Sequence, residues 1–425
     1  MDFNYLKEIR KFYETGSNIL EIIFILGNNT CDMDSTLSAY LLSIGKNIKK
    51  GTLLVDKNGN PSINKEAKCL FLPVLNIIRG TLKYRIDVKH VLDRFGIDEN
   101  DFWYISDEIF NPNKLFQHEN NSKNIKTNLI IVDHTILMDE QKYLSEYVIS
   151  IYDHHLLSNY NSQYKNLQSV NITYPVGSCT TLILSEYFND NFPVKIVSPL
   201  LSVTAILLDT KNFDEDFYEK RWSDLDSIIF KKIKNIIKSQ NENIKLKKYY
   251  KEIKEIKHDI EKNLDLGFEP LVSKDQKSFN WNNRQKAIWS SLPISYNEIK
   301  KKFGHKKILN HYMDFYKGKT DEDKKNTFFI TNSSLGNKQK LFTIFNPIKI
   351  PFNKDEIKKE LCKHSEEDFY SVDINNIADE DEKAKGEECN IVVSDTYSRK
   401  NFEPMLKSFF SNFNLEKKTE NKEGK

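Results

Sequence analysis

The chain has 425 residues, of which 39% are hydrophobic and 29% are charged, so it is long enough for two ordinary domains and has a globular composition. Its formal net charge is only +2, so the overall charge does not by itself indicate a polyanionic partner. Any anionic partner must be bound by a local group of basic residues, and we expect no nucleic acid partner.

The cysteines and the apolar runs indicate in which cellular compartment the protein is expected. The five cysteines are scattered without a CxxC spacing, at Cys31, Cys69, Cys179, Cys362 and Cys389. The odd number, the scatter and the lack of CxxC spacing together argue against a disulfide framework and a cysteine zinc site, so we expect a cytoplasmic protein. The early run ILEIIFILG contains Glu21 and is shorter than the roughly 18 to 20 residues that span a bilayer. Without a small-residue cleavage site after it, we expect neither a signal peptide nor a membrane anchor.

Short β-rich runs alternate with helical patterns in the first half of the chain, which is typical of βαβ units around a mostly parallel sheet. The runs EIIFILG (21–27), NLIIVD (128–133) and YVISIYD (147–153) predict buried strands. In open α/β sheets ligands bind beyond the carboxyl ends of the strands. The polar residues that follow these three runs are therefore candidates for a site.

Two helices are predicted near these strands. The first is STLSAYLLSIGK (35–46), capped by Ser35, and the second is GSCTTLILSEYF (177–188), opened by Ser178. The N–H groups at the second start could orient the loop at 153–155 or a phosphate. We favour the simpler interpretation, a helix N-terminus without a ligand.

The second half of the chain predicts a smaller, mixed α/β domain. Residues 225–263 are rich in lysine and have a helical period, and we place the helical connection between domains at 241–265. The first domain is then 1–240 and the second 266–412. The remaining tail, 413–425, is too polar to bury and is expected to be disordered.

The stretch GNNTCDMDS follows the first predicted strand and carries Asn28, Asp32 and Asp34. Carboxylates at positions i and i+2 of a tight loop can each reach a different cation of a shared site. Oxygen ligands of this kind suit Mg²⁺ or Mn²⁺. The alternative is that the aspartates cap the following helix, and this stretch alone does not decide between the two.

The second predicted strand ends in Asp133-His134, and the third ends in Asp153-His154-His155. Either group alone could be a cap or lie at the edge of the core. Three strand ends that all carry aspartate, two of them with histidine, favour a metal site. A further acid, Asp209, ends the apolar run SVTAILLD, where a carboxylate needs a partner or a metal.

The order NxxxDxD, VDH, DHH and LLDT resembles the four N-terminal motifs of the DHH phosphoesterase superfamily. This resemblance implies a DHH domain with a mostly parallel sheet flanked by helices. It also implies roles for six residues: Asp32 as a ligand of a first metal, Asp34, His154 and Asp209 as ligands of a second, Asp133 as the bridging carboxylate, and His155 as the contact to the substrate phosphate. Asp133, His154 and His155 are the expected catalytic residues.

The second domain indicates the branch of the superfamily. The chain has no two adjacent glycines, so it lacks the GGGH-type motif of the nuclease branch. The stretches KDQKSF and SRKNFEP resemble the Asp-x-Lys and Ser-Arg-Lys motifs of the C-terminal domain of family II pyrophosphatases and of the exopolyphosphatase and Prune group. The resemblance implies that Lys277, Arg399 and Lys400 bind substrate phosphates, with the active site in the cleft between the domains.

Three further residues are expected on the substrate side. Asn28 stands where family II pyrophosphatases have a metal-binding histidine and eukaryotic exopolyphosphatases have asparagine. The segment YRIDVKHVLDRFGI resembles a Prune and exopolyphosphatase segment built around an arginine, here Arg85. His134 is assigned only a substrate-side position, because related enzymes vary at the residue that follows it.

The resemblance implies an exopolyphosphatase, a hydrolase that releases terminal orthophosphate from inorganic polyphosphate by attack of a metal-activated water. Its cofactors would be two divalent cations, Mg²⁺ or Mn²⁺, with Co²⁺ as a further candidate. Two alternatives remain, a family II-like inorganic pyrophosphatase and a Prune-like phosphodiesterase or regulatory binding protein. Pyrophosphate and nucleoside polyphosphates are further candidate substrates, and no membrane partner is expected.

Overall fold

A computed structural model describes residues 4–16, 18–117, 125–155, 163–188, 192–240, 244–281, 285–348, 354–361, 369–378, 385–394 and 399–412. The tail predicted as disordered, 413–425, and Cys362 lie outside these residues. The chain divides into two compact units, Met1–Lys257 and His258–Lys425. The division falls within the segment predicted to connect the domains.

The first unit is built on a six-stranded sheet in which all neighbouring strands are parallel. In sheet order the strands are β5 (Trp103–Tyr104), β4 (Cys69–Leu75), β1 (Glu21–Leu26), β6 (Lys126–Val132), β7 (Val148–Asp153) and β8 (Ser169–Ile172). Strands β1, β6 and β7 confirm the three predicted strands, and they are adjacent in the sheet. A separate hairpin joins β2 (Leu53–Val55) and β3 (Pro61–Ile63).

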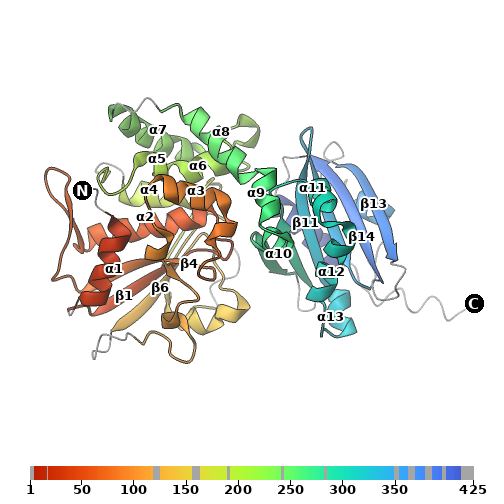
Figure 1. The fold of residues 1–425 in the computed structure, drawn as a ribbon, viewed down its shortest axis with the longest axis horizontal. Helices are drawn as coiled ribbons and strands as arrows, with labels where there is room; N and C mark the ends of the chain where they lie inside the picture. Colours follow the sequence, from red (N-terminus) through yellow and green to blue (C-terminus); the bar gives the residue numbers. More distant parts are fainter. Residues whose placement is uncertain are drawn as a thin grey trace, which may run out of the picture. The chain divides into compact units, whose positions relative to one another are not determined.

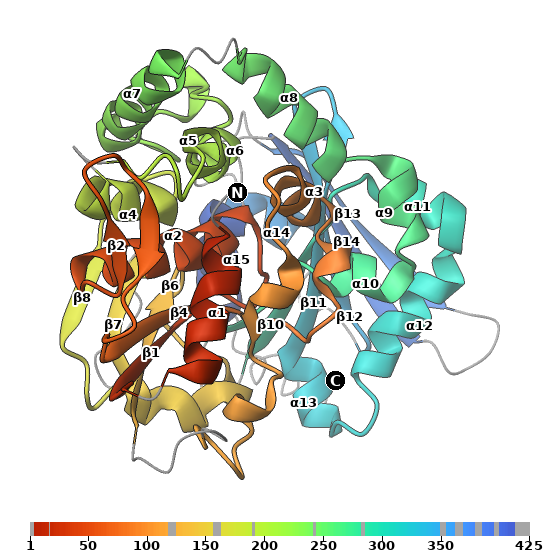
Figure 2. The same cartoon turned by 60° about the vertical axis from the view of Figure 1, so that its left-hand side comes forward.

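Helices flank this sheet, as predicted, and α2, α4, α5, α6 and α7 lie to one side of the strands (Figures 1 and 2). The α-helices are α1 (Tyr5–Thr15), α2 (Met33–Lys49), α3 (Ile86–Arg94), α4 (Cys179–Tyr187), α5 (Pro199–Ser202), α6 (Thr204–Asp209), α7 (Asp224–Ser239) and α8 (Leu246–Lys257). The 3₁₀ helices are η1 (Leu82–Tyr84), η2 (Glu99–Asp101), η3 (Glu108–Phe110), η4 (Asp139–Tyr147) and η5 (Glu215–Phe217). Helix α2 packs on β1, β4 and β6 and also contacts α4 and α6.

The start of α2 differs from the prediction. Asp32 is the N-cap, since its Oδ1 accepts a hydrogen bond from the Ser35 N–H at 3.0 Å. The predicted Ser35 cap is wrong, because an aspartate three residues earlier takes that role. The Ser35 hydroxyl instead accepts from the Asn28 N–H at 2.7 Å. The start of α4 after Ser178 is confirmed.

The second unit has a mixed sheet, which confirms the predicted mixed α/β class. Its strands run in the order β13 (Phe369–Ala378), β14 (Lys385–Ser394), β12 (Gln339–Asn346), β11 (Thr327–Gly336), β10 (Lys286–Ser291) and β9 (Gln276–Asn280). Only the pair β10–β11 is parallel among these strands. The helices are α9 (Ile260–Asp265), α10 (Phe268–Ser273), α11 (Tyr296–Phe303), α12 (His305–Phe315), α13 (Asp321–Asn326), α14 (Lys354–Leu361) and α15 (Arg399–Asn412).

Alternate residues of this mixed sheet belong to two separate hydrophobic cores. Trp289 and Phe328 join a cluster with Phe402 of α15, whereas their neighbours Ile288 and Phe329 join a cluster with residues of α10, α11 and α12. Successive strand residues point to opposite faces, so this alternation places helices on both faces of the sheet.

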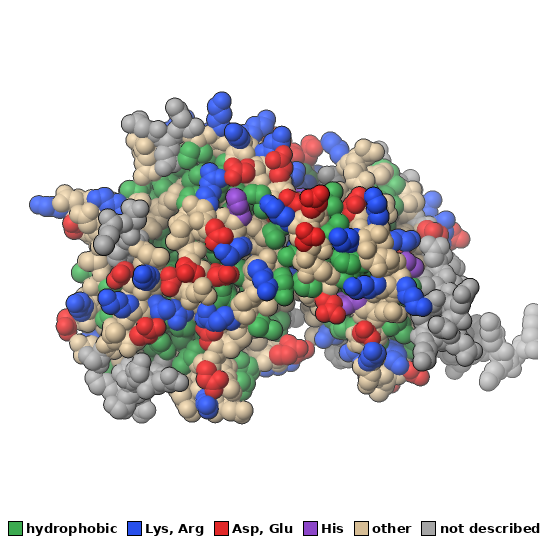
Figure 3. Space-filling view, viewed as in Figure 1, with side chains coloured by type: hydrophobic (Ala, Val, Ile, Leu, Met, Phe, Trp, Pro, Cys, Tyr) green, Lys and Arg blue, Asp and Glu red, His purple; other side chains and the backbone are tan. Residues whose placement is uncertain are grey.

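The surface fits the small net charge. Acidic and basic side chains are interspersed on the face shown in Figure 3. Among the helices of the described residues, none is long and apolar enough to cross a membrane. The four cysteines in the described part, Cys31, Cys69, Cys179 and Cys389, are free thiols.

Candidate metal centre

The carboxyl ends of β6 and β7 bring a group of acidic and imidazole side chains together. Asp133, Asp153, His154 and His155 each offer a ligand atom, and these atoms all lie within 4.8 Å of one another. The first three of these residues are buried. Because the strands are parallel neighbours, their ends meet at one edge of the sheet, and the resulting cluster could hold a metal ion.

Asp133 is fixed at the end of β6 by its backbone and by Asn28. Its φ of +60° lies in the left-handed region, and its N–H donates to the carbonyl of Tyr152 at 2.8 Å. Such a conformation is uncommon for a residue other than glycine, although Asp and Asn tolerate it best. Asp133 Oδ2 accepts from Asn28 Nδ2 at 2.5 Å, and the Asn28 side-chain oxygen accepts from Thr30. Asn28 therefore orients the central carboxylate.

The environment of Asp133 disfavours its charged form. Burial, together with the negative charge of Asp34, raises the pKa of Asp133 to about 8, although the hydrogen bond from His154 acts in the opposite direction. A buried pair of carboxylates is costly unless a positive charge lies beside it. A divalent cation would offset this repulsion, so the donor set fits a metal ion.

His154 presents one nitrogen to the two carboxylates. Its Nδ1 lies 2.8 Å from the carbonyl oxygen of Val176, which can only accept a hydrogen bond, so Nδ1 carries a proton. Its Nε2 lies 3.2 Å from Asp133 Oδ1 and 3.4 Å from Asp34 Oδ2. Oxygen and nitrogen ligands lie about 2.0 to 2.2 Å from a small divalent cation, so two adjacent ligands of one cation are about 3 Å apart. These three atoms have spacings suited to ligands of one cation.

Asp34 is held at the N-terminus of α4. Its Oδ1 accepts from the Ser178 hydroxyl at 2.6 Å and from the N–H and hydroxyl of Thr180, both at 2.9 Å. Its Oδ2 accepts from the Cys179 N–H at 2.8 Å. A helix N-terminus stabilises negative charge, and here it does so for a carboxylate of the protein. The favoured interpretation of this helix start, an N-terminus without a ligand, missed its role in positioning Asp34.

Asp153 orients His155. Asp153 Oδ1 lies 2.6 Å from His155 Nδ1 and also accepts from the backbone N–H of His154 at 2.8 Å. Burial raises the pKa of Asp153, but the charge and hydrogen bond of His155 outweigh it, so this pKa lies well below its ordinary value. The His155 side chain is 26% exposed, unlike that of His154 at 3%. The sequence analysis assigned Asp153 no role beyond its place before the two histidines.

Asp32 and Asp209 are not among the four clustered residues. Asp32 caps α2, and its Oδ2 accepts from the Thr30 hydroxyl at 3.1 Å. Asp209 ends α6, and an added Cβ at Gly177 would lie only 2.9 Å from Cγ2 of the adjacent Thr210. The loop before α4 thus touches the end of α6. The metal-binding roles of Asp32 and Asp209 stay predictions.

Arg85 and His134 lie in the same unit. Arg85 is a buried residue between η1 and α3. His134 Nδ1 lies 2.9 Å from the carbonyl oxygen of Val132. Their substrate-side roles stay predictions.

In the second unit the two motifs predicted to bind phosphate meet each other. Arg399 Nη2 lies 2.9 Å from Asp275 Oδ1, and Nη1 donates to the Asp275 carbonyl at 2.9 Å. Lys277 is paired with Trp289 across β9 and β10, and the Trp289 carbonyl accepts from Arg399 Nη1 at 3.4 Å. Lys400 belongs to α15, and its side chain lies outside the described part.

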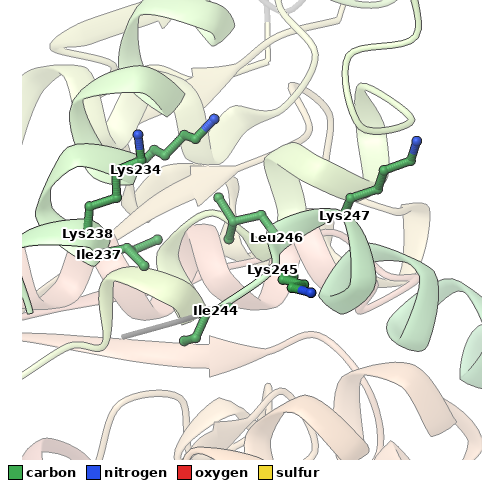
Figure 4. A pocket seen from close by; sticks show the side chains of 7 residues that line it. All are labelled: Lys234, Ile237, Lys238, Ile244, Lys245, Leu246 and Lys247. Carbon is green, nitrogen blue, oxygen red and sulfur yellow. The ribbon is translucent and has the colours of Figure 1, made fainter. Parts of the chain in front are cut away.

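A pocket of about 380 Å³ lies where α7 ends and α8 begins (Figure 4). It is lined by Lys234, Ile237, Lys238, Ile244, Lys245, Leu246 and Lys247. Its lining offers no carboxylate, imidazole or thiol, so it does not provide the ligands of a metal site. The pocket is therefore separate in chemistry from the Asp and His cluster.

The chain has relatives among curated proteins, although no family model matches it. It is 31% identical over 193 residues to Exopolyphosphatase PRUNE1 of Homo sapiens, 30% over 213 residues to that of Bos taurus, and 32% over 193 residues to that of Mus musculus. These matches cover 45%, 50% and 45% of this chain. They span only 36%, 40% and 36% of the relatives' own length.

The parallel sheet with acidic and histidine residues at its strand ends has the character of a DHH phosphoesterase. The similarities to these relatives support a place for the chain in the DHH phosphoesterase superfamily. Within that superfamily, they support the exopolyphosphatase and Prune group. The type of its C-terminal domain stays a prediction.

Proposed function

We propose that the protein is a metal-dependent exopolyphosphatase that releases terminal orthophosphate from inorganic polyphosphate. The observation that carries this proposal is the meeting of His154 Nε2 with Asp133 Oδ1 and Asp34 Oδ2 at 3.2 and 3.4 Å. The printed name of the relatives, exopolyphosphatase, supports the same class of substrate. The scattered cysteines favour the cytoplasm as the site of the reaction.

The proposed cofactors are two divalent cations, Mg²⁺ or Mn²⁺, with Co²⁺ as a further candidate. Their proposed ligands are Asp32, Asp34, Asp133, His154 and Asp209. When bound, such cations polarise a phosphoryl oxygen, neutralise developing charge and lower the pKa of water. One imidazole among carboxylates favours Mn²⁺ over Mg²⁺, because Mg²⁺ prefers oxygen ligands alone.

The residues around the proposed ligands fix them before any cation binds. The Val176 carbonyl selects the His154 tautomer, the start of α4 holds Asp34, and Asn28 holds Asp133. Ligand atoms that are already in place need little rearrangement on binding. The chain's own contribution is therefore a rigid, buried set of donors.

His155 is proposed to contact the substrate phosphate. Its Nδ1 is fixed by Asp153 at 2.6 Å, and this carboxylate also favours a positively charged imidazole. The ring is partly exposed, so its Nε2 can donate a hydrogen bond to a phosphate oxygen. In this proposal His155 orients substrate and stabilises its negative charge.

Lys277, Arg399 and Lys400 are proposed to bind further phosphates of the substrate, together with Asn28, Arg85 and His134. Arg399 has a planar fork suited to two phosphate oxygens, whereas the lysines act as point charges. The contact of Arg399 with Asp275 supports a shared role for the two motifs, since it gathers Lys277 and Arg399 at one place. Pyrophosphate and nucleoside polyphosphates are further proposed substrates.

The second candidate is a family II-like inorganic pyrophosphatase, because both groups would use the same type of cluster. Asn28 argues against it, since that side chain donates to Asp133 instead of offering a nitrogen ligand. A Prune-like regulatory binding protein is a third candidate. A purely binding role would not require a buried pair of carboxylates beside a histidine, so the intact cluster favours an enzyme.

Phosphate release from polyphosphate, pyrophosphate and a cyclic nucleotide, measured side by side with Mn²⁺ or Mg²⁺, tests the proposal. We expect the highest kcat/KM on polyphosphate and no release after chelation. Faster turnover of pyrophosphate would favour the second candidate. Binding of polyphosphate without any turnover would favour the regulatory protein.

A further inference from the structure

A buried carboxylate outside the cluster, that of Asp226, has more hydrogen bonds than its place in the helix requires. Asp226 is the third residue of α7 and is completely buried. Its Oδ2 accepts from the Ser223 N–H at 3.0 Å, which completes a capping box with the Ser223 side chain. A capping box stabilises the start of a helix and involves only these two residues.

Two further hydrogen bonds tie Asp226 to the segment before and within α4. Its Oδ2 accepts from the Gly177 N–H at 2.9 Å, and its Oδ1 accepts from the Thr181 hydroxyl at 2.6 Å. These two donors stand on either side of residues 178–180. The carboxylate therefore holds this short segment at both ends.

The segment held in this way positions two proposed metal ligands. The carbonyl of Val176, next to Gly177, accepts from His154 Nδ1 at 2.8 Å. The N–H groups of Cys179 and Thr180 donate to Asp34 at 2.8 and 2.9 Å. A shift of the segment would move the side chains of His154 and Asp34, because both are hydrogen-bonded to the backbone of the segment.

The close packing around Gly177 leaves little room for such a shift. An added Cβ at Gly177 would lie 2.9 Å from Thr210 Cγ2 and 3.2 Å from Trp222 Cβ. Only glycine allows this close approach without movement of a neighbour. The Gly177 N–H is thus packed between α6 and the chain before α7, where it meets Asp226.

We infer that Asp226 is a positioning residue of the metal centre, which sets His154 and Asp34 through the segment 176–180. This inference rests on the proposed metal site. Its chemistry needs no contact with the cation or the substrate, since the carboxylate acts only on the protein groups that hold the ligands. Outer partners of metal ligands typically change metal affinity or activity by roughly 10- to 100-fold when they are removed.

The chain offers a matched control for this role. Ser223→Ala removes the hydroxyl of the same capping box but leaves the bonds of Asp226 to Gly177 and Thr181. Thr181→Val removes one of those bonds in nearly the same volume. Asp226→Asn keeps an acceptor for the two backbone N–H groups and offers an N–H to the Thr181 hydroxyl, so it should rescue most of the role.

The experiment measures Mn²⁺ affinity by titration calorimetry, together with Tm and kcat, for the parent and for Asp226→Ala, Asp226→Asn, Thr181→Val and Ser223→Ala. We expect Asp226→Ala to weaken Mn²⁺ binding about 10-fold or more, Thr181→Val to weaken it less, and Asp226→Asn to stay near the parent. Ser223→Ala should lower Tm without a change in Mn²⁺ affinity, as expected for a helix cap alone.

Equal Mn²⁺ affinity in the parent, Asp226→Ala and Thr181→Val would overturn the inference, and so would equal losses in Asp226→Ala and Ser223→Ala. If Asp226→Ala does not fold, the Mn²⁺ affinities of Thr181→Val and Ser223→Ala are compared instead. Equal affinities in these two variants would then overturn the inference. A parent that binds Mn²⁺ but does not hydrolyse polyphosphate contradicts the proposed activity and leaves this comparison intact. A parent that binds no Mn²⁺ overturns both.

Discussion

The two units hold their polar motif residues in opposite ways. In the first unit Asp133 and His154 are buried and surrounded by fixed donors and acceptors. In the second unit Arg399 and Asp275 form a pair whose side chains are 14% and 26% exposed, beside the edge strand β9. The first arrangement is buried, and the second is partly exposed.

This difference matches the two tasks proposed for them. Two buried carboxylates beside each other are costly without a cation, so their geometry must be fixed by the protein before the cation arrives. A partly exposed ion pair has modest stability and can exchange one partner for another anion. We expect metal binding to depend on the first unit alone and substrate affinity to depend on the second unit as well, and the following changes test this division.

The largest effect is expected from Asp133→Asn. Asparagine is isosteric and tolerates the left-handed φ of +60°, so the fold should persist. The loss of a ligand should lower kcat by more than the roughly 100-fold caused by loss of an outer partner. Phosphate release at saturating Mn²⁺ and circular dichroism measure the two effects. Activity comparable to the parent would remove Asp133 from the metal site.

The next largest effect concerns the second unit. Arg399→Ala should lower kcat/KM about 10- to 100-fold, because a lost charge-assisted contact costs roughly 1.5 to 3 kcal/mol. Arg399→Lys should also be impaired, since a point charge cannot replace a bidentate fork. Lys400→Ala should act in the same direction. Mn²⁺ affinity, set by the first unit, should stay unchanged in all three.

Asp275→Asn provides the control for Arg399. It removes the ion pair seen at 2.9 Å but keeps the guanidinium, so it should lower Tm while reducing kcat/KM less than Arg399→Ala does. Equal losses of kcat/KM in the two variants would mean that Arg399 acts only through the fold. Lost Mn²⁺ binding in either variant would contradict the division between the units.

A smaller effect is expected from Asn28→His. Imidazole is a better ligand than a neutral amide for Mn²⁺ or Co²⁺, so this variant should bind these ions more tightly. It should also lose the donor that orients Asp133 at 2.5 Å. We expect the ratio of polyphosphate to pyrophosphate turnover to fall several-fold. An unchanged ratio would show that Asn28 does not set substrate preference.

The smallest expected effect is a dependence of the stability of the metal-free protein on pH. Because the pKa of Asp133 is raised from 3.8 to about 8, the folded, metal-free protein holds a proton that the unfolded chain has released across this range. Stability of the chelated protein, measured as Tm, should therefore fall as pH rises from about 4 to about 8. Asp133→Asn and added Mn²⁺ should each reduce this fall. If Tm falls equally with pH in the chelated parent and in chelated Asp133→Asn, then Asp133 does not cause the pH dependence.

The strand-end cluster was predictable because its signals are local. The runs 21–27, 128–133 and 147–153 become the adjacent strands β1, β6 and β7, and a parallel arrangement is enough to bring their ends together. Asp34, Asp133 and Asp153 and the histidines at 154 and 155 then lie close together. A polar residue after each strand is visible in the sequence, whereas the order of the strands in the sheet is not.

Contacts between residues that are distant in the sequence were not predictable in the same way. Ser178 meets Asp34 across 144 residues, and Arg399 meets Asp275 across 124, and no periodic pattern connects such distant positions. The true cap of α2 was missed for a local reason. Asp32 and Ser35 are both favourable caps, and their spacing alone does not select one.

The central claim is that the cluster of Asp133, His154 and Asp34 holds divalent cations. Anomalous diffraction at the manganese edge from crystals grown with Mn²⁺ tests it most directly. The account predicts an anomalous peak within bonding distance, roughly 2.0 to 2.3 Å, of His154 Nε2 and an Asp133 oxygen. Full Mn²⁺ saturation without a peak at these atoms, or with a peak only at another group, would contradict it.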